Sequence, residues 1–167
     1  MTTSVNQNIQ LRKATVNDIQ KILFLLSSNY EGMSLFQQTE KEIRKNIYDF
    51  ILAEDEKGKV IGCAALHKYN NDIAEILAVS VLPENKNSGI GKSLITKCID
   101  NAVFNNINLL WLATSKPGYF SRYKFQPISK WSLPANIIFH KFKLVFRQPV
   151  KRWIPAFFGR HTFMKYK

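Results

Sequence analysis

The stretch LPENKNSGIGKSL, residues 82–94, has the residue types of a phosphate-binding loop. Its end, Gly91-Lys92-Ser93, matches the end of a Walker A motif, but that motif needs a glycine where Lys86 stands. The remaining interpretation is a glycine-containing turn that opens directly onto a helix. Backbone N–H groups at a helix N-terminus favour an anion, and glycines let the backbone approach it closely. The alternative is a plain strand-to-helix turn.

A single carboxylate, Glu75, stands in the apolar run 73–82. Strand alternation predicts that it shares one face of the strand with Leu77, Val79 and Val81. Burial among apolar neighbours raises the pKa of a carboxyl toward the range that suits a general base. Glu75 is therefore a candidate base, and the alternative is a paired or edge-facing glutamate without a catalytic role.

The helices that must position these residues follow from capping and spacing. Two [ST]-x-x-[DE] starts, 15–18 and 39–42, are each followed by apolar residues at helical intervals. After the glycine loop, an apolar residue at every fourth position predicts an amphipathic helix packed on a sheet. The residues of that stripe are Ile90, Leu94, Cys98 and Ala102.

Strands alternate with these helices. They are predicted at 50–54, 58–69, 72–82 and 108–114, with tight turns at Lys57-Gly58 and Asn70-Asn71. The stretch 116–125 predicts a Pro-Gly turn, a short helix and the start of a strand. The order of elements predicts an α+β fold, in which a mixed, mostly antiparallel central sheet is flanked by helices.

Composition indicates a globular chain with one strongly basic half. Apolar residues make up 46% of the 167 residues, and the net charge is +12. Residues 1–100 contain 12 basic and 12 acidic residues, whereas residues 101–167 contain 12 basic residues and no acidic one. This asymmetry favours an anionic partner for the C-terminal half: a membrane surface, nucleic acid or a polyphosphate.

Other residue types exclude several classes of protein. There is no run of eighteen apolar residues that would predict a membrane span. The polar start MTTSVNQN is neither a secretory signal nor a transit peptide, so we expect the protein in a cytoplasm or an equivalent organelle stroma. Cys63 and Cys98 lie in apolar runs and predict buried reduced thiols. His67, His140 and His161 have no metal-ligand spacing, so no metal is expected.

The loop and the layout together resemble the GNAT superfamily of acetyl-CoA-dependent N-acetyltransferases. The family's pyrophosphate loop is [QR]-x-x-G-x-[GA] after a strand that ends in V-x-P; here VLP (81–83) precedes KNSGIG (86–91). Lys86 keeps the charge of the usual arginine without its fork geometry. The stretch YFSRYKF (119–125) matches the family's late FYxxxGF, with Lys124 where glycine is usual. The resemblance covers roughly residues 9–130 and implies the GNAT fold.

A narrower resemblance is to the acetyltransferase module of N-acetylglutamate synthase. It rests on GCAAL (62–66), AEI (74–76) and KPGYFSRYKFQPISKWSLP (116–134). Such modules acetylate the α-amine of glutamate, the first step of arginine synthesis. This sequence has Gln37 and Gln38 near the family's basic positions, and neutral amides hold a substrate carboxylate less well than arginine does.

The resemblance implies acetyl-CoA as co-substrate and direct transfer of acetyl to a primary amine. It implies an acidic base near Glu75, and backbone N–H groups on the strand that bind the pantetheine arm and polarise the thioester. The implied cofactor-binding residues are Val79, Ser80, Val81, Lys86, Asn87, Ser88, Gly89, Ile90, Gly91, Lys92 and Ser93. Many members protonate the CoA thiolate with a tyrosine where Phe120 stands, which leaves Tyr119 and Tyr123 as candidate acids or as packing aromatics.

The chain is divided here into a flexible N-terminus (1–8), a GNAT domain (9–132) and a basic amphipathic extension (133–167). Pro134 is expected to open a helix that alternates apolar and basic residues until Pro149. Basic residues then interleave with Trp and Phe, which suits an anionic membrane surface or an acidic partner. The alternatives are that the apolar side packs on the domain or on a second copy in a homodimer. Nucleic acid is the weaker option.

Three functions follow from these observations. The first is an acetyltransferase for a small amine, with glutamate as the best single acceptor. The second is an enzyme of the same kind that acetylates another amine or a protein N-terminus or lysine. The third is a non-catalytic acetyl-CoA-binding module docked by its basic tail, favoured by Phe120 and Lys86.

Overall fold

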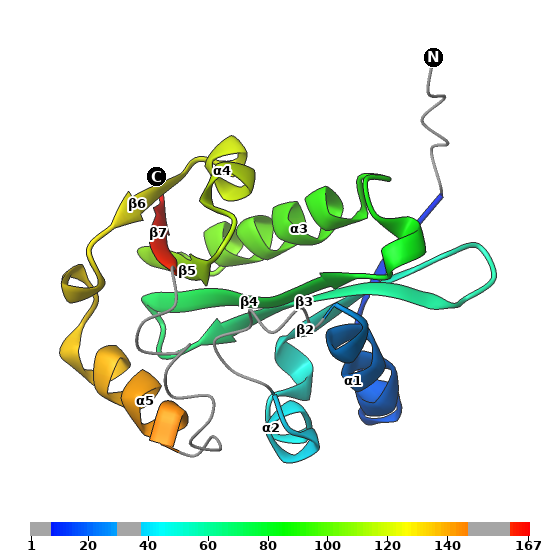
Figure 1. Cartoon of the computed structure of the whole chain (residues 1–167), viewed down its shortest axis with the longest axis horizontal. Coiled ribbons are helices and arrows are strands. Elements are labelled where there is room, and N and C mark those ends of the chain that lie inside the picture. Colours follow the sequence, from blue (N-terminus) through cyan, green and yellow to red (C-terminus); the bar gives the residue numbers. More distant parts are fainter. Residues whose placement is uncertain (1–7, 30–37, 147–160) are drawn as a thin grey trace. The chain divides into compact units, whose positions relative to one another are not determined.

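The computed structural model describes residues 8–29, 38–146 and 161–167, and of residues 140 and 142–146 it describes the backbone alone. The described residues fall into two compact parts. Figure 1 labels their helices and strands. The N-terminal part comprises residues 8–29 and 38–108, and the C-terminal part comprises residues 109–146 and 161–167. Each part has its own antiparallel strands and is described by itself.

Four antiparallel strands form the N-terminal part, in the order β1-β2-β3-β4. They are β1 (Gln10–Lys13), β2 (Phe50–Glu54), β3 (Val60–Lys68) and β4 (Ile73–Val81). Both predicted turns are confirmed. Gly58 has φ +74° after Asp55, whose carboxylate accepts two backbone N–H groups of that turn at 2.9 Å. Asn70 accepts two backbone N–H groups in the β3–β4 turn at 2.8 and 2.9 Å.

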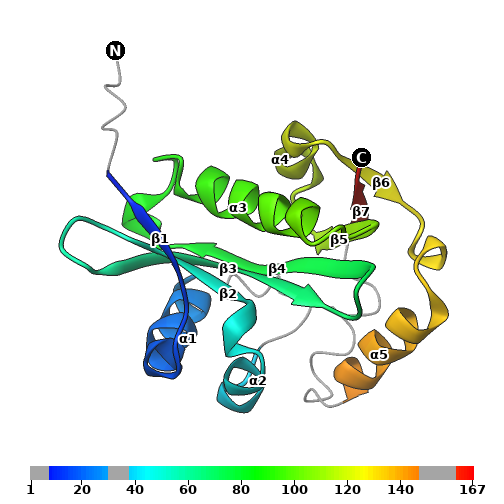
Figure 2. The ribbon, with the colours of Figure 1, turned by 180° about the vertical axis from the view of Figure 1, so that it is seen from behind.

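Three helices cover the two faces of this sheet. They are α1 (Ile19–Ser28), α2 (Glu40–Lys45) and α3 (Ile90–Phe104). Figure 2 shows α3 on one face and α1 with α2 on the other. Both predicted helix starts are capping boxes: Thr15 pairs with Asp18, and Thr39 pairs with Glu42. The predicted apolar stripe of α3 is buried at all four positions.

Gly62 in β3 sets how closely α3 approaches the sheet. A Cβ at this position would lie 3.0 Å from Ile90 Cγ2, 3.1 Å from Leu94 Cδ1 and 3.2 Å from the carbonyl oxygen of Ser80. These distances are shorter than ordinary carbon contacts, so the missing side chain is what lets the helix lie directly on β3. The face of the sheet that carries Gly62 is therefore the α3 face.

The C-terminal part has three antiparallel strands in the order β5-β7-β6. They are β5 (Leu109–Thr114), β6 (Phe125–Ile128) and β7 (Thr162–Tyr166), with α4 (Pro117–Phe120) before β6 and α5 (Ala135–Phe146) after it. Strand β7 was not predicted, because five residues offer too little alternation beside so basic a tail. It pairs with both neighbours and buries Met164 completely.

The prediction that Pro134 opens a helix is confirmed, because α5 begins at the next residue and its first turn bonds to the Pro134 carbonyl at 3.0 Å. Pro149 and the basic, aromatic segment 151–158 lie outside the described residues. The division at residue 132 remains a prediction.

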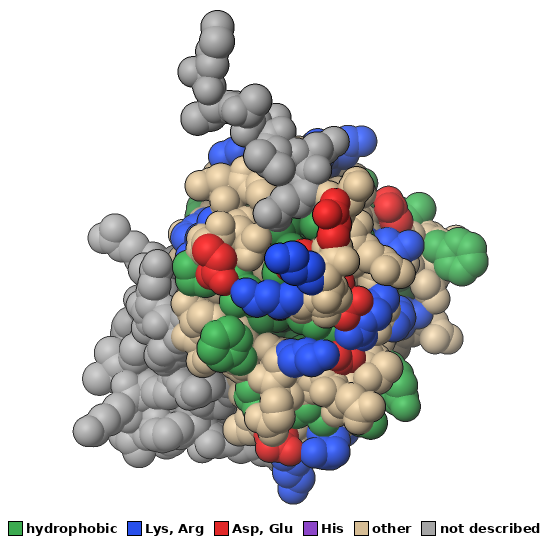
Figure 3. All heavy atoms as spheres, turned by 90° about the vertical axis from the view of Figure 1, so that its right-hand side faces the viewer, with side chains coloured by type: hydrophobic (Ala, Val, Ile, Leu, Met, Phe, Trp, Pro, Cys, Tyr) green, Lys and Arg blue, Asp and Glu red, His purple; other side chains and the backbone are tan. Residues whose placement is uncertain are grey.

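Cys63 and Cys98 are buried free thiols, as predicted, and burial raises the pKa of each to about 12. Within the described ranges, no helix is long and apolar enough to cross a bilayer, and no His, Cys, Asp and Glu side chains gather as a metal-binding group. Basic and acidic side chains are interspersed on the face drawn in Figure 3.

Candidate active site

The predicted phosphate loop joins β4 to α3 through a left-handed backbone. After a turn of 3₁₀ helix, Pro83–Asn85, the chain passes through Asn87 at φ +65° and Gly89 at φ +88°, and α3 begins at Ile90. An L side chain is strained at such φ values, asparagine less so than others, and glycine not at all. The Asn and Gly of this loop are therefore required by its shape, independently of any ligand.

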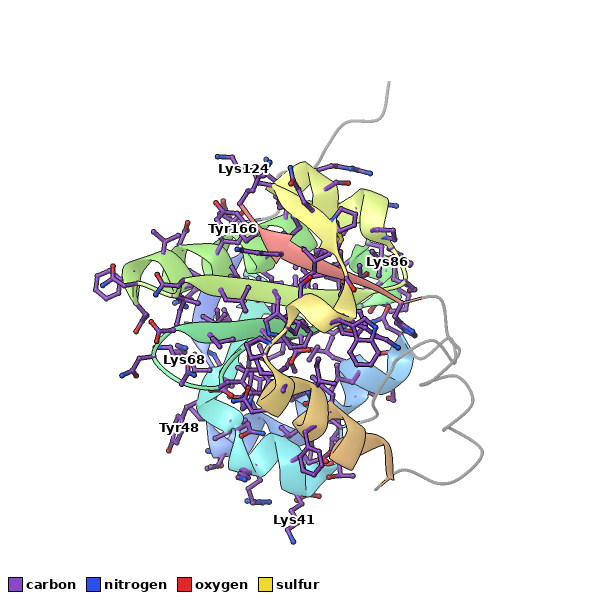
Figure 4. The ribbon with its side chains drawn as sticks, turned by 90° about the vertical axis from the view of Figure 1, so that its left-hand side faces the viewer. Lys41, Tyr48, Lys68, Lys86, Lys124 and Tyr166 are labelled. Atoms are coloured by element: carbon purple, nitrogen blue, oxygen red, sulfur yellow. The ribbon has the colours of Figure 1, made fainter. Side chains whose placement is uncertain are left out.

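The loop offers an anion backbone donors and exposed cations. The first intrahelical bond runs from Ser93 N to Gly89 O at 3.0 Å, so the N–H groups before it in the first turn have no helical acceptor. Lys86 and Lys92 are exposed, and Figure 4 labels Lys86. The side chain of Ile90 is only 1% exposed and belongs to the core, so this residue offers its backbone alone.

The two loop hydroxyls have partners within the loop. Ser88 Oγ donates to the carbonyl of Asn85 at 2.6 Å, and Ser93 Oγ donates to the carbonyl of Gly89 at 3.4 Å. The first bond is short and fixes the loop, whereas the second is long and weak. Of the two, the Ser93 hydroxyl is the one that a ligand exchanges more easily.

A bulge in β4 overturns the predicted alternation of that strand. Ala65 lies opposite Leu77, but Cys63 lies opposite Ser80, so β4 has one more residue than β3 at this point. Ala78, within the bulge, has φ +56°. The prediction that Glu75 shares a face with Val81 is therefore wrong, because an extra residue inverts the alternation beyond it. Glu75, Leu77 and Ser80 face α1 and α2, whereas Val81, opposite Gly62, faces α3.

Ser80 has a structural side chain. Its hydroxyl is buried, donates to the carbonyl of Leu25 in α1 at 2.7 Å and accepts from Asn29 Nδ2 at 2.8 Å. The same amide of Asn29 donates to the carbonyl of Val81 at 2.8 Å. These bonds tie the end of α1 to the end of β4. Among the residues predicted to bind a cofactor, Ser80 thus has only its backbone to offer.

Glu75 is buried, as predicted, with 4% of its surface exposed. Tyr69 donates its hydroxyl to Glu75 Oε2 at 2.7 Å. Burial raises the pKa of Tyr69 well above its ordinary value, and the neighbouring carboxylate raises it further. The tyrosine thus keeps its proton at neutral pH and is the donor in this bond.

Two further residues, His67 and Asp49, adjoin this pair and were not predicted to belong to the site. His67 lies directly opposite Glu75 in the β3–β4 ladder, and its ring contacts the ring of Tyr69 edge to face at 4.9 Å. Its Nδ1 is 2.7 Å from Asp49 Oδ2. Hairpin register alone places His67 and Tyr69 on the Glu75 face, so the signal was present in the sequence. Asp49 gave no such signal.

The two predicted tyrosines belong to the C-terminal part. The ring of Tyr119 packs against those of Phe120 and Tyr123, with centroids 5.3 and 5.5 Å apart. Burial raises the pKa of Tyr119, and its hydrogen bond with Tyr123 adds to the rise. Tyr119 therefore retains its proton at neutral pH, so its hydroxyl remains a proton donor. The structure brings the two tyrosines together, and it brings Glu75 together with Tyr69.

Residues 16–123 match the acetyltransferase (GNAT) family. An uncharacterized N-acetyltransferase of Chlorobaculum tepidum is 36% identical over 107 residues, which are 64% of this chain and 68% of that protein. An amino-acid acetyltransferase of Mycobacterium tuberculosis is 28% identical over 76% of this chain and 74% of its own length. The amino-acid acetyltransferase of Aeromonas salmonicida is 32% identical, but the match spans only 29% of that protein.

Solved structures show the same fold over nearly the whole chain. A Mycobacterium tuberculosis protein in complex with CoA has a TM-score of 0.78 at 24% identity, over 94% of this chain and 98% of that one. N-acetylglutamate synthase of Neisseria gonorrhoeae, complexed with coenzyme A and N-acetyl-glutamate, has a TM-score of 0.77 at 24% identity. That match covers 95% of this chain and 34% of the synthase. The likeness in fold therefore extends beyond residue 132.

Proposed function

This chain belongs to the acetyltransferase (GNAT) family, and we propose that it moves acetyl from acetyl-CoA directly to a primary amine of a small molecule. The observation that carries the proposal is that one compact part holds both functional elements. These are the left-handed loop at the start of α3 and the buried carboxylate of Glu75.

In this reaction, the amine nitrogen attacks the thioester carbonyl, the carbon–sulfur bond breaks and CoA leaves as a thiolate. The amine must lose a proton, and we assign that proton to Glu75. A buried carboxylate that is already hydrogen-bonded has a fixed position from which to accept it. The thiolate is a good leaving group, and Tyr119 or Tyr123 is the candidate to protonate it.

We assign the CoA diphosphate to the loop. Its ligands would be the N–H groups from Asn87 to Lys92, the charges of Lys86 and Lys92, and the Ser93 hydroxyl. The backbone of Val79, Ser80 and Val81 would hold the pantetheine arm. The bulge at Ala78 supports this assignment, because a bulge interrupts the ladder on the strand that must offer those donors.

The α-amine of L-glutamate is our best single acceptor, which would place the protein in arginine biosynthesis, in a cytoplasm or an organelle stroma. Support comes from the relatives named amino-acid acetyltransferase and from the synthase complexed with N-acetyl-glutamate. Gln38 is neutral where the resemblance implies basic residues, and Gln37 lies outside the described residues. The acceptor is thus the part of the proposal that most needs a direct test.

The test is the release of free CoA from acetyl-CoA by the purified protein. The acceptors to compare are glutamate, the other amino acids, polyamines and short peptides. Turnover with glutamate supports the full proposal, and turnover with another amine or a peptide moves the substrate but keeps the reaction. If the protein binds acetyl-CoA but turns over none of these acceptors, the proposal of an enzyme is overturned, and a non-catalytic acetyl-CoA-binding module is favoured.

The C-terminal part supports a second proposal, that it docks on an anionic membrane surface. Trp131 and Phe139 are 69% and 72% exposed, and the Lys130 ammonium lies 4.9 Å from the centre of the Trp131 ring. No acidic residue occurs from residue 101 onward. Exposed aromatic rings among cations are typical of proteins that lie at a lipid interface.

Vesicle flotation tests this docking. Phosphatidylcholine vesicles with phosphatidylglycerol should bind the protein, salt should weaken binding, and phosphatidylcholine alone should not bind. The double variant Trp131→Ala/Phe139→Ala should lose about tenfold in affinity. Phe104→Ala, which removes an 86% exposed ring from the N-terminal part, is the control. A dimer in solution with no vesicle binding would assign this surface to a second copy instead.

A further inference from the structure

Glu75 is held by a tyrosine from the turn between β3 and β4, and nothing in the proposed reaction accounts for that contact. The Tyr69 hydroxyl lies 2.7 Å from Glu75 Oε2 and donates to it. We propose that Tyr69 is a positioning residue, which fixes the Glu75 carboxylate in the orientation in which it accepts the proton of the acceptor amine. This inference rests on the proposed role of Glu75 as the base.

The backbone of Tyr69 is itself fixed by the hairpin. Its N–H donates to the carbonyl of Ile73 at 2.9 Å, directly where β3 turns into β4. The carboxamide of Asn70 accepts the N–H groups of Asp72 and Ile73 and closes the same turn. A side chain at this point is therefore as well placed as one within the sheet, and its hydroxyl reaches a carboxylate only six residues further along the chain.

The ring of Tyr69 is held from its other side by His67. The two rings meet edge to face, with centroids 4.9 Å apart and planes at 79°. His67 is held in turn by Asp49, at 2.7 Å, and both of these side chains are about one quarter exposed. Three segments of the chain, the turn Ile47–Asp49, β3 and β4, thus supply one connected set of contacts that ends on Glu75.

One chemical effect follows from the Tyr69 bond. A hydroxyl on one carboxylate oxygen restricts rotation of the group, so less orientational freedom is lost when the amine arrives. The ionisable side chains described next to Glu75 are Tyr69 in the β3–β4 turn and His67 on β3, with Asp49 beyond His67.

Tyr69→Phe tests the proposal, because it removes the hydroxyl and keeps the ring. We expect kcat to fall about tenfold, because the carboxylate loses the hydroxyl that orients it toward the amine. The KM for acetyl-CoA should stay unchanged. The acidic limb of the pH profile of kcat should move to higher pH, because a carboxylate without this donor is protonated more easily.

Tyr48→Phe is the matched control. Tyr48 is 75% exposed and its side chain points away from the ribbon (Figure 4), so the same change there should leave the pH profile as in the wild type. If Tyr69→Phe and Tyr48→Phe behave alike, the proposal is overturned. If Tyr69→Phe does not fold, His67→Phe keeps the hydroxyl and removes the Asp49 contact, and it should shift the limb less but in the same direction. If His67→Phe folds and the acidic limb of its pH profile of kcat does not shift, the proposal is overturned as well.

A second readout separates this proposal from the reaction itself. NMR follows the carboxyl carbon signal of Glu75 as a function of pH, without substrate, in the wild type and in Tyr69→Phe. The signal is assigned as the one that is missing from the spectrum of Glu75→Gln. A higher carboxyl pKa in the variant supports the role of Tyr69 even if no amine is acetylated. If the wild type and Tyr69→Phe have equal titration curves and equal turnover, Glu75 can still be the base, but Tyr69 does not position it.

Discussion

The two parts of the chain bury different chemistry. In the N-terminal part, two buried carboxylates have polar partners: Asp18 binds Arg12 through two bonds of 2.8 and 2.9 Å, and Glu75 accepts from Tyr69. In the described C-terminal part, ring contacts take their place, such as Trp111 with Phe163 at 6.0 Å between centroids. No carboxylate side chain is available there, because residues 101–167 contain no acidic residue.

The difference shows where a proton can be accepted. Among the described residues, carboxylate side chains occur only in the N-terminal part, whereas the C-terminal part offers phenols, aromatic rings, cations and the imidazole of His161. Phenols and cations donate protons or hold anions, but at neutral pH they do not take a proton from an amine. The division of charge along the sequence is thus also a division of chemical roles.

The largest effect is expected at Glu75. Glu75→Gln keeps the size of the side chain and removes the base, so kcat should fall about 10²- to 10⁴-fold. Glu56→Gln, at an exposed position in the β2–β3 turn, is the control and should keep full activity. Tyr119→Phe and Tyr123→Phe should cost much less, because a thiolate leaves without help. Steady-state CoA release measures the turnover of all four variants. Unchanged turnover in Glu75→Gln would show that Glu75 is not the base.

A second expected effect concerns acid stability in the N-terminal part. The hydrogen bonds from Arg12 hold the pKa of Asp18 well below its ordinary range. A lowered folded-state pKa adds stability that is fully present above the unfolded value of about 3.9, and this contribution is lost gradually as pH falls from there through the lower folded value. Asp18→Asn should therefore cost about 2 kcal/mol of unfolding free energy at pH 7 and less at pH 3.

Urea unfolding at the two pH values measures this difference. Asp100→Asn, on the exposed face of α3, is the matched control and should change little at either pH. A cost for Asp18→Asn that is equal at pH 7 and pH 3 would mean that the charge of Asp18 contributes nothing, and that only its shape matters.

Much of the N-terminal part could be predicted from the sequence because its signals are local. Capping boxes at 15–18 and 39–42 mark helix starts, and the four-residue apolar interval of α3 corresponds to a buried stripe. The bulge at Ala78 could not be predicted, since neither a glycine nor a proline marks it. One extra residue was enough to assign Val81 to the wrong face, and β7 was missed because its pairing partners are distant in sequence.

The site was predictable to the same degree. The loop and Glu75 were found because each stands out against its neighbours in the sequence. Tyr69 was not found, because a tyrosine after a strand is ordinary and only the hairpin places it on Glu75. The contact of Asp49 with His67 depends on how the turn Ile47–Asp49 and β2 pair with β3, which no local pattern encodes.

Gly89 tests whether the loop backbone serves a ligand or only a turn. Gly89 and Gly58 both have positive φ and open space where a Cβ would stand, so alanine costs each about 1–2 kcal/mol of backbone strain. In Gly89→Ala, the loop is expected to change shape to relieve this strain. Acetyl-CoA binding should therefore weaken about tenfold as well. Gly58→Ala should lose similar stability and keep its affinity. Calorimetric titration that gives both variants the same affinity would favour the plain turn.

The smallest expected effect is a gain, in the C-terminal part. Lys124 has φ +65°, a left-handed conformation that strains a side chain by about 1–2 kcal/mol, and glycine is the usual residue there in the resembling family. Lys124→Gly removes that strain but adds about 0.5–1 kcal/mol of backbone entropy cost, which leaves a net gain of about 0.5 kcal/mol. Lys116, at φ −122°, gains nothing from the same change, so Lys116→Gly controls for the lost charge and should lower stability slightly. Thermal unfolding measures the melting temperatures of the two variants. A higher melting temperature for Lys116→Gly than for Lys124→Gly would show that the left-handed backbone at Lys124 does not strain the protein.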